Sequence, residues 1–415
     1  MRHITIIGAG QAGLQLGLGL LQHNYDVTIV SDRTPIQILH GRATGAATLF
    51  HTALSLEQSL GYNDWPEAVP TRNVLLEMYT PGGILPIQSP LPHPWITVDQ
   101  RLKHAVWLHQ FSRQGGRVVA QPATIEDVDD YARESDLVVI AGRGRQFNGL
   151  FKRDEHRSIF DRPQRRLLQV YLIGVHPWYA ATNPQTKISF IPGVGEIFFL
   201  PIYTNLRQQA HTLQVEAVPG GPLDPVRLPT NGPDCLATVR ELMAVVSPWH
   251  YGKIKNAELS DGTSWLAGSL TPTVRKGVAR LPSGTPVLGI GDVTNLNDPV
   301  GGQGANNATK FAHFLIKRIA ERVEQPFDAV WMHDVFEEFW RYSRYVNAFN
   351  NGLLVPPLPH QQHILLAASQ NKSIAADFIQ GFDNPPSLFP WFIDPAAAER
   401  YLAAHGISRF MPVAL

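Results

Sequence analysis

The sequence contains a single cysteine, Cys235, among its 415 residues. One cysteine excludes an intramolecular disulfide and a thiolate metal cluster and is typical of a reducing compartment, so we expect a cytoplasmic protein. The sequence also contains no run of eighteen apolar residues that could cross a bilayer. The apolar N-terminal run is broken by glycines and has no cationic leader, so we expect it to be part of the fold.

Charged residues are scarce and balanced. They make up 17% of the chain, and 35 basic side chains cancel 35 acidic ones. No dense basic run is interleaved with aromatic residues, so we expect neither nucleic acid nor an anionic membrane surface as a partner. With 44% hydrophobic residues, the chain is a folded protein with a large core and a small-molecule partner.

The common metal and hydrolase motifs are missing as well. H-E-x-x-H, C-x-x-C and G-x-S-x-G do not occur, and His250, His333 and Asp334 do not have the spacing of metal ligands. We therefore expect no metal site and no serine nucleophile.

The first motif that is present is a glycine-rich turn near the N-terminus. "HITIIGAG" is a short β-rich run, "QAGLQLGLGLLQH" has helical spacing of apolar residues, and "DVTIV" resumes a buried strand. In this βαβ context the glycines let backbone N–H groups approach a pyrophosphate at the positive end of the helix. The predicted cofactor-binding residues of this turn are Gly8, Gly10, Gln11, Ala12 and Gly13.

The ribose contact of such a site normally comes from an acid at the end of the second strand. Here Ser31 occupies that end and Asp32 follows it. Either residue could bind the ribose, and the alternative is a solvated Asp32 that caps a turn.

A second glycine-rich motif, "GDVTNLNDPVGGQGANN", covers residues 291–307. Asp292 could accept hydrogen bonds from a polyol such as ribityl, and the N–H groups at 301–305 could meet the negative charge of a reduced flavin ring. Taken alone, the motif could be a simple turn. Paired with the first motif, it indicates the flavin end of FAD.

The remaining pattern predicts an α/β fold. We expect a discontinuous Rossmann-like FAD-binding domain at 1–162 and 276–330, with an inserted antiparallel β-sheet substrate domain at 163–275. We also expect a hairpin near 70–95, and whether it belongs to the substrate domain is left open. Helical periodicity predicts a C-terminal helical region at 331–415.

Several segments together resemble a known family, the oxygenase components of styrene and indole monooxygenases. The segments are "GAGQAGLQLGLGLLQHNYDVTIVSDR" (8–33), "NDWP" (63–66), "VDQRL" (98–102), "FDRPQR" (160–165) and "GIGDVTNLNDPVGGQGAN" (289–306). The resemblance spans most of the chain and is looser between 205 and 285. Flavin halogenases share the general scheme, but their W-x-W-x-I-P segment does not occur here.

The resemblance implies a two-component FAD-dependent monooxygenase of the aromatic-hydroxylase fold. A separate NADH-dependent flavin reductase would supply FADH₂, which would react with O₂ to a C4a-hydroperoxyflavin. One oxygen atom would pass to a small apolar aromatic substrate, by epoxidation of a vinyl aromatic or indole or by sulfoxidation, with no dedicated acid or base. Whether the chain forms a homodimer is left open.

The resemblance also implies a set of site residues. Gly301, Gly302, Gln303 and Gly304 would line the flavin ring, and Pro299 and Val300 would lie near the peroxide. For Arg42 and Arg101 it implies contacts to phosphate or to the ring edge, with a surface ion pair as the alternative. The other predicted cofactor-binding residues are Gly142, Gly291, Ala305 and Asn306.

One part of the chain departs from the family pattern. Styrene-type members have an Asn-x-Val-x-His pattern after the second strand, and here Gly45, Ala47 and Leu49 align with it. Their smaller side chains predict a roomier or differently shaped pocket and a different substrate, with Ala47 and Leu49 as pocket candidates.

Two other functions are weighed against this one. A single-component NAD(P)H-dependent aromatic hydroxylase needs its own nicotinamide access, and "DLVVIAGRGR" at 136–145 shows no clear second acidic-glycine motif. A non-catalytic dinucleotide-fold escort protein has no use for N–H donors directed at a ring, so the loop at 301–305 argues against it.

Overall fold

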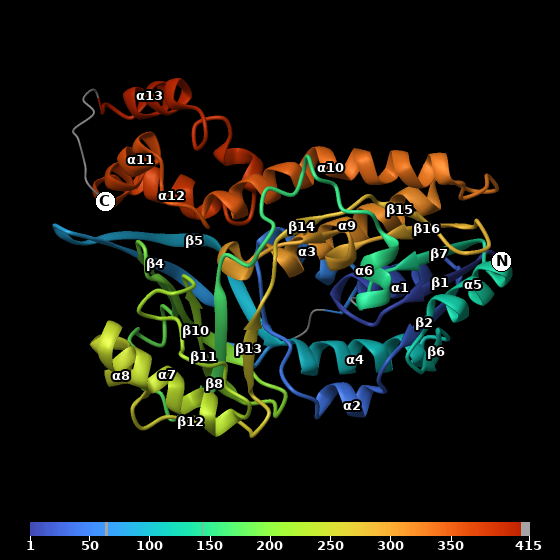
Figure 1. Ribbon diagram of the computed structural model, residues 1–415, viewed down its shortest axis with the longest axis horizontal. Coiled ribbons are helices and arrows are strands. Elements are labelled where there is room, and N and C mark those ends of the chain that lie inside the picture. Colours follow the sequence, from blue (N-terminus) through green and yellow to red (C-terminus); the bar gives the residue numbers. More distant parts are fainter. Residues whose placement is uncertain (63–64, 143, 408–415) are drawn as a thin grey trace.

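The computed structural model describes residues 1–62, 65–142 and 144–407 of the chain (Figure 1). Asn63 and Asp64 of the "NDWP" segment and Arg143 lie outside the described residues. Within these ranges, no helix is both long enough and apolar enough to cross a membrane. The same ranges contain no group of three or more His, Cys, Asp or Glu side chains that could hold a metal ion.

A six-stranded sheet forms the dinucleotide-binding part. Its strand order is β15-β16-β7-β1-β2-β6, with parallel pairing except between β15 and β16. The strands are β1 (His3–Ile7), β2 (Asp26–Ser31), β6 (Arg117–Ala120), β7 (Leu137–Ile140), β15 (Val278–Arg280) and β16 (Pro286–Gly289). The predicted βαβ unit is confirmed, because α1 (Gln11–Gln22) joins β1 to the parallel strand β2.

Helices cover both faces of this sheet, as its continuous apolar strands require. One face packs on α1, α4 (Gln100–Arg113), α9 (Gln303–Ala320) and α10 (Ala329–Gly352). The other face packs on α5 (Ile125–Glu134) and α6 (Arg145–Leu150). The composition of residues 124–135 indicates only a polar segment, but Thr124 and Asp127 form a capping box that starts α5 there.

A nine-stranded sheet forms the second part, with the order β12-β8-β11-β10-β9-β4-β5-β3 and with β13 on β8. Its strands are β3 (Ala46–Leu49), β4 (Thr71–Thr80), β5 (Gly83–Asp99), β8 (Arg166–Ile173), β9 (Gln185–Ile191), β10 (Gly195–Tyr203), β11 (Gln209–Ala217), β12 (Glu258–Leu259) and β13 (Trp265–Ser269). The hairpin expected near 70–95 is confirmed as β4–β5, and it pairs in this sheet through β9.

The side chains of β10 alternate between the two faces of the nine-stranded sheet. Ile197 and Phe199 pack against α7 (Gly232–Val246), whereas Phe198 and Leu200 join the core beneath the C-terminal helices. The expectation of strands alone at 163–275 is corrected by α7 and α8 (Pro248–Ile254). These helices form in that range because Leu236, Val239 and Met243 make a helical apolar face.

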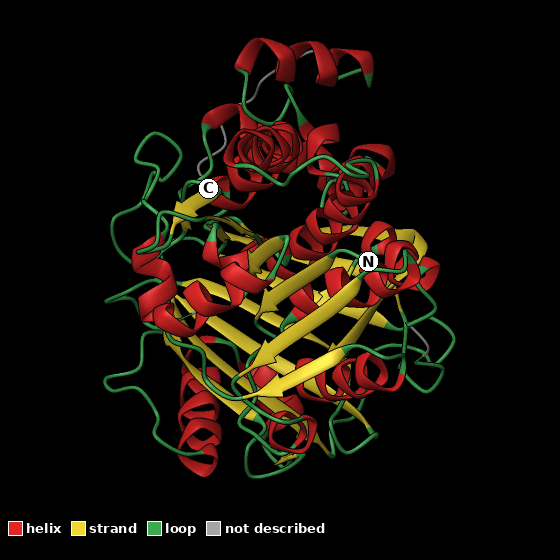
Figure 2. Ribbon diagram, turned by 90° about the vertical axis from the view of Figure 1, so that its right-hand side faces the viewer, coloured by secondary structure: helices red, strands yellow, loops and turns green. Residues whose placement is uncertain are grey.

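The predicted helical C-terminal region is confirmed. After α10 follow α11 (Pro359–Gln370), α12 (Lys372–Gln380), η3 (Pro385–Leu388) and α13 (Pro395–Ala404). In Figure 1, α11 and α12 lie over the β4–β5 hairpin, and Figure 2 shows the C-terminal helices above the strands. Together with β4, β5, β9 and β10 they enclose one hydrophobic core.

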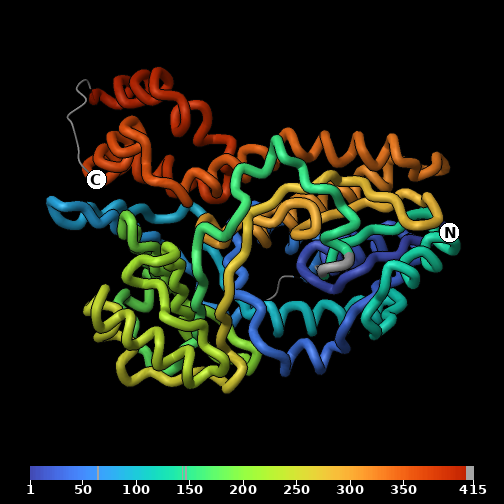
Figure 3. The backbone as a smooth tube through the Cα atoms, in the orientation of Figure 1, coloured from blue at the N-terminus to red at the C-terminus, as the bar shows by residue number. Residues whose placement is uncertain are grey.

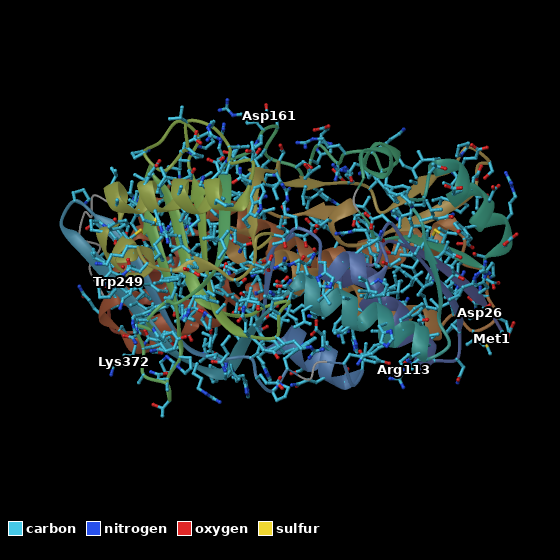
Figure 4. All side chains as sticks on the ribbon, turned by 90° about the horizontal axis from the view of Figure 1, so that it is seen from below. Met1, Asp26, Arg113, Asp161, Trp249 and Lys372 are labelled. Atoms are coloured by element: carbon cyan, nitrogen blue, oxygen red, sulfur yellow. The ribbon has the colours of Figure 1, made fainter. Side chains whose placement is uncertain are left out.

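Short elements connect the two sheets. They are α2 (Pro35–Leu39), α3 (His51–Ser59), η1 (Gly291–Val293), η2 (Pro299–Gly301) and the small pair β14 (Thr273–Val274) with β17 (Asn295–Leu296). The segments before β8 and after β13 run side by side between the sheets, where Asp154 N donates to Val274 O at 2.9 Å (Figure 3). Figure 4 shows Met1 and Asp26 at one end of the molecule and Trp249 and Lys372 at the other.

Candidate cofactor and substrate site

The first glycine-rich turn is closed by backbone contacts. Gly8 has φ +115°, and a Cβ on it would lie 2.5 Å from Gly142 N; a Cβ on Gly13 would lie 2.0 Å from Gly8 O. Only glycine fits these two positions. Gly10 differs, because it caps α1 without a side-chain hydrogen bond and a Cβ on it would meet no heavy atom within 4 Å. Its outer side leaves room for a ligand at the helix N-terminus.

A buried ion pair anchors this turn from below. Gln11 Nε2 donates to Glu57 Oε1 at 2.7 Å and to Thr309 Oγ1 at 2.8 Å. Lys103 Nζ pairs with Glu57, and both side chains are fully buried. Desolvation raises the pKa of Glu57 and lowers that of Lys103, and their mutual attraction opposes both shifts. Through Gln11, which bonds to Glu57 and Thr309, this ion pair connects α1 to α3, α4 and α9.

The two glycine-rich motifs meet at the carboxyl end of the parallel strands. Gly291, with φ +65°, follows β16 and would place a Cβ 3.1 Å from the Cβ of Ala12. Asp292 is half-buried in η1 beside this contact. The two motifs are therefore in contact, although Gly8 and Gly291 are 283 positions apart in sequence. They meet at the edge where ligands of open α/β sheets bind.

Side chains hold most of the loop at 298–302, in addition to one backbone bond from Gly302 N to Pro299 O at 2.8 Å. Asp298 Oδ1 accepts from Val300 N at 3.2 Å, and Asn350 Oδ1 accepts from Gly301 N at 3.1 Å. Gln303 Nε2 donates to Gly301 O at 3.0 Å and to Phe382 O at 2.8 Å. The loop ends at Gly302 in the left-handed region, with φ +63°.

The start of α9 is tied to β3. Asn306 Nδ2 donates to Thr48 O at 2.9 Å and to Gly302 O at 2.7 Å, and Phe50 N donates to Asn306 Oδ1 at 2.9 Å. No side chain caps α9, and a Cβ on Gly304 would meet nothing within 4 Å. The first N–H groups of α9 therefore lie beside β3 at a position where a ligand has room.

An aromatic cluster borders this loop. The ring centroids of Phe50 and Trp95 are 4.5 Å apart, and Phe382 lies 6.3 Å from Phe50 and 6.2 Å from Trp95. A Cβ on Gly302 would lie 3.0 Å from Phe50 Cζ, and Val300 is fully buried in the same core. The loop thus meets an apolar surface from β5 and the C-terminal helices.

A polar surface faces the loop from the other side, and sequence reasoning missed it. On β11 the side chains of Leu213 and Val215 point toward α7, so Gln214 and Glu216 lie on the opposite face. Gln169 Nε2 donates to Gln214 Oε1 at 2.7 Å, which extends this polar row to β8. The alternation in "HTLQVEAV" could have revealed the row, but polar residues that alternate along a strand usually face solvent.

Four predicted cofactor residues occupy other environments. Ser31 is buried at the end of β2 and donates to Arg33 O at 2.7 Å, whereas the Asp32 side chain is 67% exposed beside Arg33. The exposed Arg42 has its guanidinium 4.8 Å from the Trp265 ring centroid. The predicted phosphate or ring contact of Arg101 needs correction.

Arg101 is an internal ion-pair residue. Its guanidinium bonds to Asp99 at 2.7 Å and Asp261 at 3.2 Å and also to Asn205 and Ser264, and its side chain is 1% exposed. Because its N–H groups are engaged within the protein, we leave Arg101 out of the cofactor site. Interactions with Ser264, Thr263 and Arg101 lower the pKa of Asp261 to about 2 against the effect of burial.

The residues fit FAD at both ends. At Gly10 the open, uncapped N-terminus of α1 suits a pyrophosphate, and at Gly304 the open N-terminus of α9 suits the electron-rich edge of a flavin. The second glycine-rich motif also contains buried polar atoms without a hydrogen-bond partner among the described residues: Asn297 Oδ1 and Nδ2, and Gln303 Oε1. Such atoms are normally satisfied by a ligand or by water.

Comparison with known proteins agrees with this geometry. A family model described as "Styrene monooxygenase A putative substrate binding domain" matches residues 142–253. Styrene monooxygenases StyA of Pseudomonas fluorescens and of a Pseudomonas sp are 27% and 28% identical to the chain over 404 and 406 residues, which cover 95% of this chain and 96% of each relative. The solved flavin-dependent brominase Bmp2 is 15% identical, with a TM-score of 0.71 over 98% of this chain and 100% of the brominase.

The fold, the site and these similarities define the class of the protein as a flavin-dependent monooxygenase with FAD as its cofactor. Within that class the chain is similar to styrene monooxygenases over nearly its whole length, and the family model of their substrate-binding domain matches residues 142–253.

Proposed function

We propose that this protein is the oxygenase of a two-component system. A separate NADH-dependent flavin reductase supplies reduced FAD, and the oxygenase inserts one atom of O₂ into a small apolar aromatic substrate. The reaction is epoxidation of a vinyl aromatic or indole, or sulfoxidation of a thioether. The second oxygen atom leaves as water, and reduced FAD provides the two electrons and activates O₂.

The observation that carries this proposal is the aromatic cluster of Phe50, Trp95 and Phe382 beside the loop at 298–302. An uncharged aromatic substrate gains free energy by leaving water for such a surface. The same surface excludes water from the place where O₂ is activated, and this protects the reaction from loss of the oxidant as peroxide.

The proposed roles of the chain are binding, orientation and exclusion of water. Gly8, Gly10 and Gly13 hold the pyrophosphate, and Asp292 binds the ribityl chain. The N–H groups of Gly304 and Ala305 stabilise negative charge on the ring, while Pro299 and Val300 form the wall beside the reacting oxygen. We assign substrate binding to the nine-stranded sheet, which adds β3, β4 and β5 to the expected domain at 163–275.

We also propose that Ala47 and Leu49 set the shape of the substrate pocket. Both are buried on β3, and the packing of Leu49 against Ala305 supports a position next to the flavin end. Gly45, with φ +139°, precedes the strand. The short side chain of Ala47 leaves room that a larger residue would fill, which favours a substrate bulkier than a single vinyl-substituted ring.

The test compares sources of reduced FAD. Purified protein receives FAD, NADH, O₂ and a panel of styrene, indole and methyl phenyl sulfide, with and without an NADH-dependent flavin reductase. We expect oxygenated product only with the reductase, or with FAD reduced chemically beforehand. Product from NADH without the reductase would instead establish a single-component hydroxylase, and failure to bind reduced FAD would contradict an enzymatic role.

A further inference from the structure

Two buried carboxyl groups meet between the substrate sheet and the glycine-rich loop. Glu216 comes from β11, Asp298 directly precedes Pro299, and both are fully buried. Their carboxyl groups are in hydrogen-bond contact. Glu216 Oε2 and Asp298 Oδ2 receive no N–H or O–H from any other described residue. Two acceptor oxygens in contact in a dry site require a proton between them.

No cation is left over to neutralise the pair among the described residues around it. Glu196 lies directly across from Glu216 on β10, and Arg165 binds it through Nε at 2.6 Å and Nη2 at 2.8 Å. Three buried carboxyl groups, those of Glu196, Glu216 and Asp298, and the guanidinium of Arg165 therefore lie together between the sheet and the loop. With Arg165 committed to Glu196, two ionised carboxylates would stand together without a counter-ion, so one of them retains its proton.

Each of the two acids accepts one N–H bond from the protein. Val300 N donates to Asp298 Oδ1, Gln214 Nε2 donates to Glu216 Oε1, and each bond favours the charged form of its acceptor. The two carboxyl groups therefore share the retained proton. Burial and the charge of Asp298 hold the pKa of Glu216 well above its usual range. Burial also raises the pKa of Asp298, but the hydrogen bond from Glu216 opposes this rise.

We propose that Glu216 and Asp298 share one retained proton in a hydrogen bond between Glu216 Oε2 and Asp298 Oδ2, and that this bridge positions the loop at 298–302. The bridge links β11 to Asp298. Asp298 in turn accepts the bond from Val300 N, so the bridge also fixes the position of Val300 in the proposed wall of the flavin site. Neither acid touches the reacting atoms, so both are positioning residues. The bridge forms regardless of which protein supplies reduced FAD.

The retained proton is tested directly by infrared difference spectroscopy at neutral pH. We expect a carboxylic acid C=O band that shifts in D₂O and is missing from Glu216→Gln, whose amide keeps the shape and a donor toward Asp298. The control Glu258→Gln, an exposed residue of the same sheet, keeps the band. Identical spectra for wild type and Glu216→Gln would overturn the proposal.

The pH dependence of unfolding provides a second readout, made on protein without cofactor. Because the folded pKa of Glu216 lies above its unfolded value near about 4.3, the wild type loses stability as pH rises between the two values. Relative to Glu216→Gln, its folded-to-unfolded ratio falls by up to about tenfold per pH unit in that window. Parallel curves for the two proteins would contradict a retained proton.

The positioning role of the Glu216–Asp298 bridge is tested by the affinity of the protein for FAD, which is measured from the quenching of flavin fluorescence. Glu216→Ala removes the bridge, and we expect it to weaken FAD binding at least about tenfold. Glu216→Gln preserves the hydrogen bond and should stay within about twofold of the wild type. Unchanged affinity in Glu216→Ala, or equal losses in both variants, would overturn the positioning role.

Discussion

The two glycine-rich segments are built in different ways, although both end in an open helix N-terminus. The segment at 8–13 is closed by backbone contacts, since Gly8 and Gly13 leave no room for a side chain. The loop at 298–306 is instead held by side chains from elsewhere in the chain, above all Asn350 and Asn306. The first segment therefore has a strict requirement for glycine and is anchored to distant elements through Gln11, whereas the second is positioned by side chains of other elements.

The largest expected effect concerns the ion pair beneath the first segment. Lys103→Met removes the cation that pairs with Glu57 and leaves a buried carboxylate beside Gln11. We expect a loss of about 3–5 kcal/mol in the free energy of unfolding, measured with denaturant. Adding Glu57→Gln should recover part of the loss, and Lys255→Met at an exposed site should change little. A small loss in Lys103→Met would show that the first segment does not rely on this anchor.

Replacement of a single side chain should destabilise the second segment. Asn306→Leu removes three hydrogen bonds and leaves Phe50 N and Thr48 O without this partner in the interior. We expect a loss of about 2–3 kcal/mol in the free energy of unfolding. Lys317→Ala, on the exposed face of α9, is the matched control. If the two variants were equally stable, the loop would be held by backbone contacts, like the first segment.

Gly13→Ala tests the closed backbone of the first segment. Its Cβ would be placed against Gly8 O, which cannot move away as a flexible side chain would. We expect a destabilisation of about 1–3 kcal/mol by thermal or chemical unfolding, together with at least about tenfold weaker FAD binding. Gly10→Ala has open space and should lose no more than about 1 kcal/mol. Equal destabilisation would contradict the difference between these two glycines.

The smallest expected effect concerns substrate choice beside the second segment. Ala47→Val narrows the proposed pocket, and we expect kcat/KM for indole to fall about tenfold relative to styrene. Ala46→Val changes the adjacent residue, whose side chain points to the other face of β3. If both variants changed the ratio equally, Ala47 would have no special role in specificity.

The sequence was sufficient for the features that local patterns encode. The turn at Gly8 to Gly13, the β4–β5 hairpin and the long C-terminal helices follow from glycine spacing and apolar periodicity. Arg101 and Glu216 could not be interpreted in this way. Their roles depend on Asp261 and Asp298, which are distant in sequence and are brought to them only by the packing of the two sheets.

The central claim is that the two glycine-rich segments bind opposite ends of one FAD. Gly10→Ala and Gly304→Ala are a matched pair, because a Cβ at either position meets no heavy atom within 4 Å. The decisive measurement is the affinity of each variant for FAD and for ADP, which carries only the adenosine and pyrophosphate end. We predict that Gly10→Ala weakens both ligands and that Gly304→Ala weakens FAD alone. Equal loss of ADP binding in both variants, or full FAD affinity in Gly304→Ala, would contradict the claim.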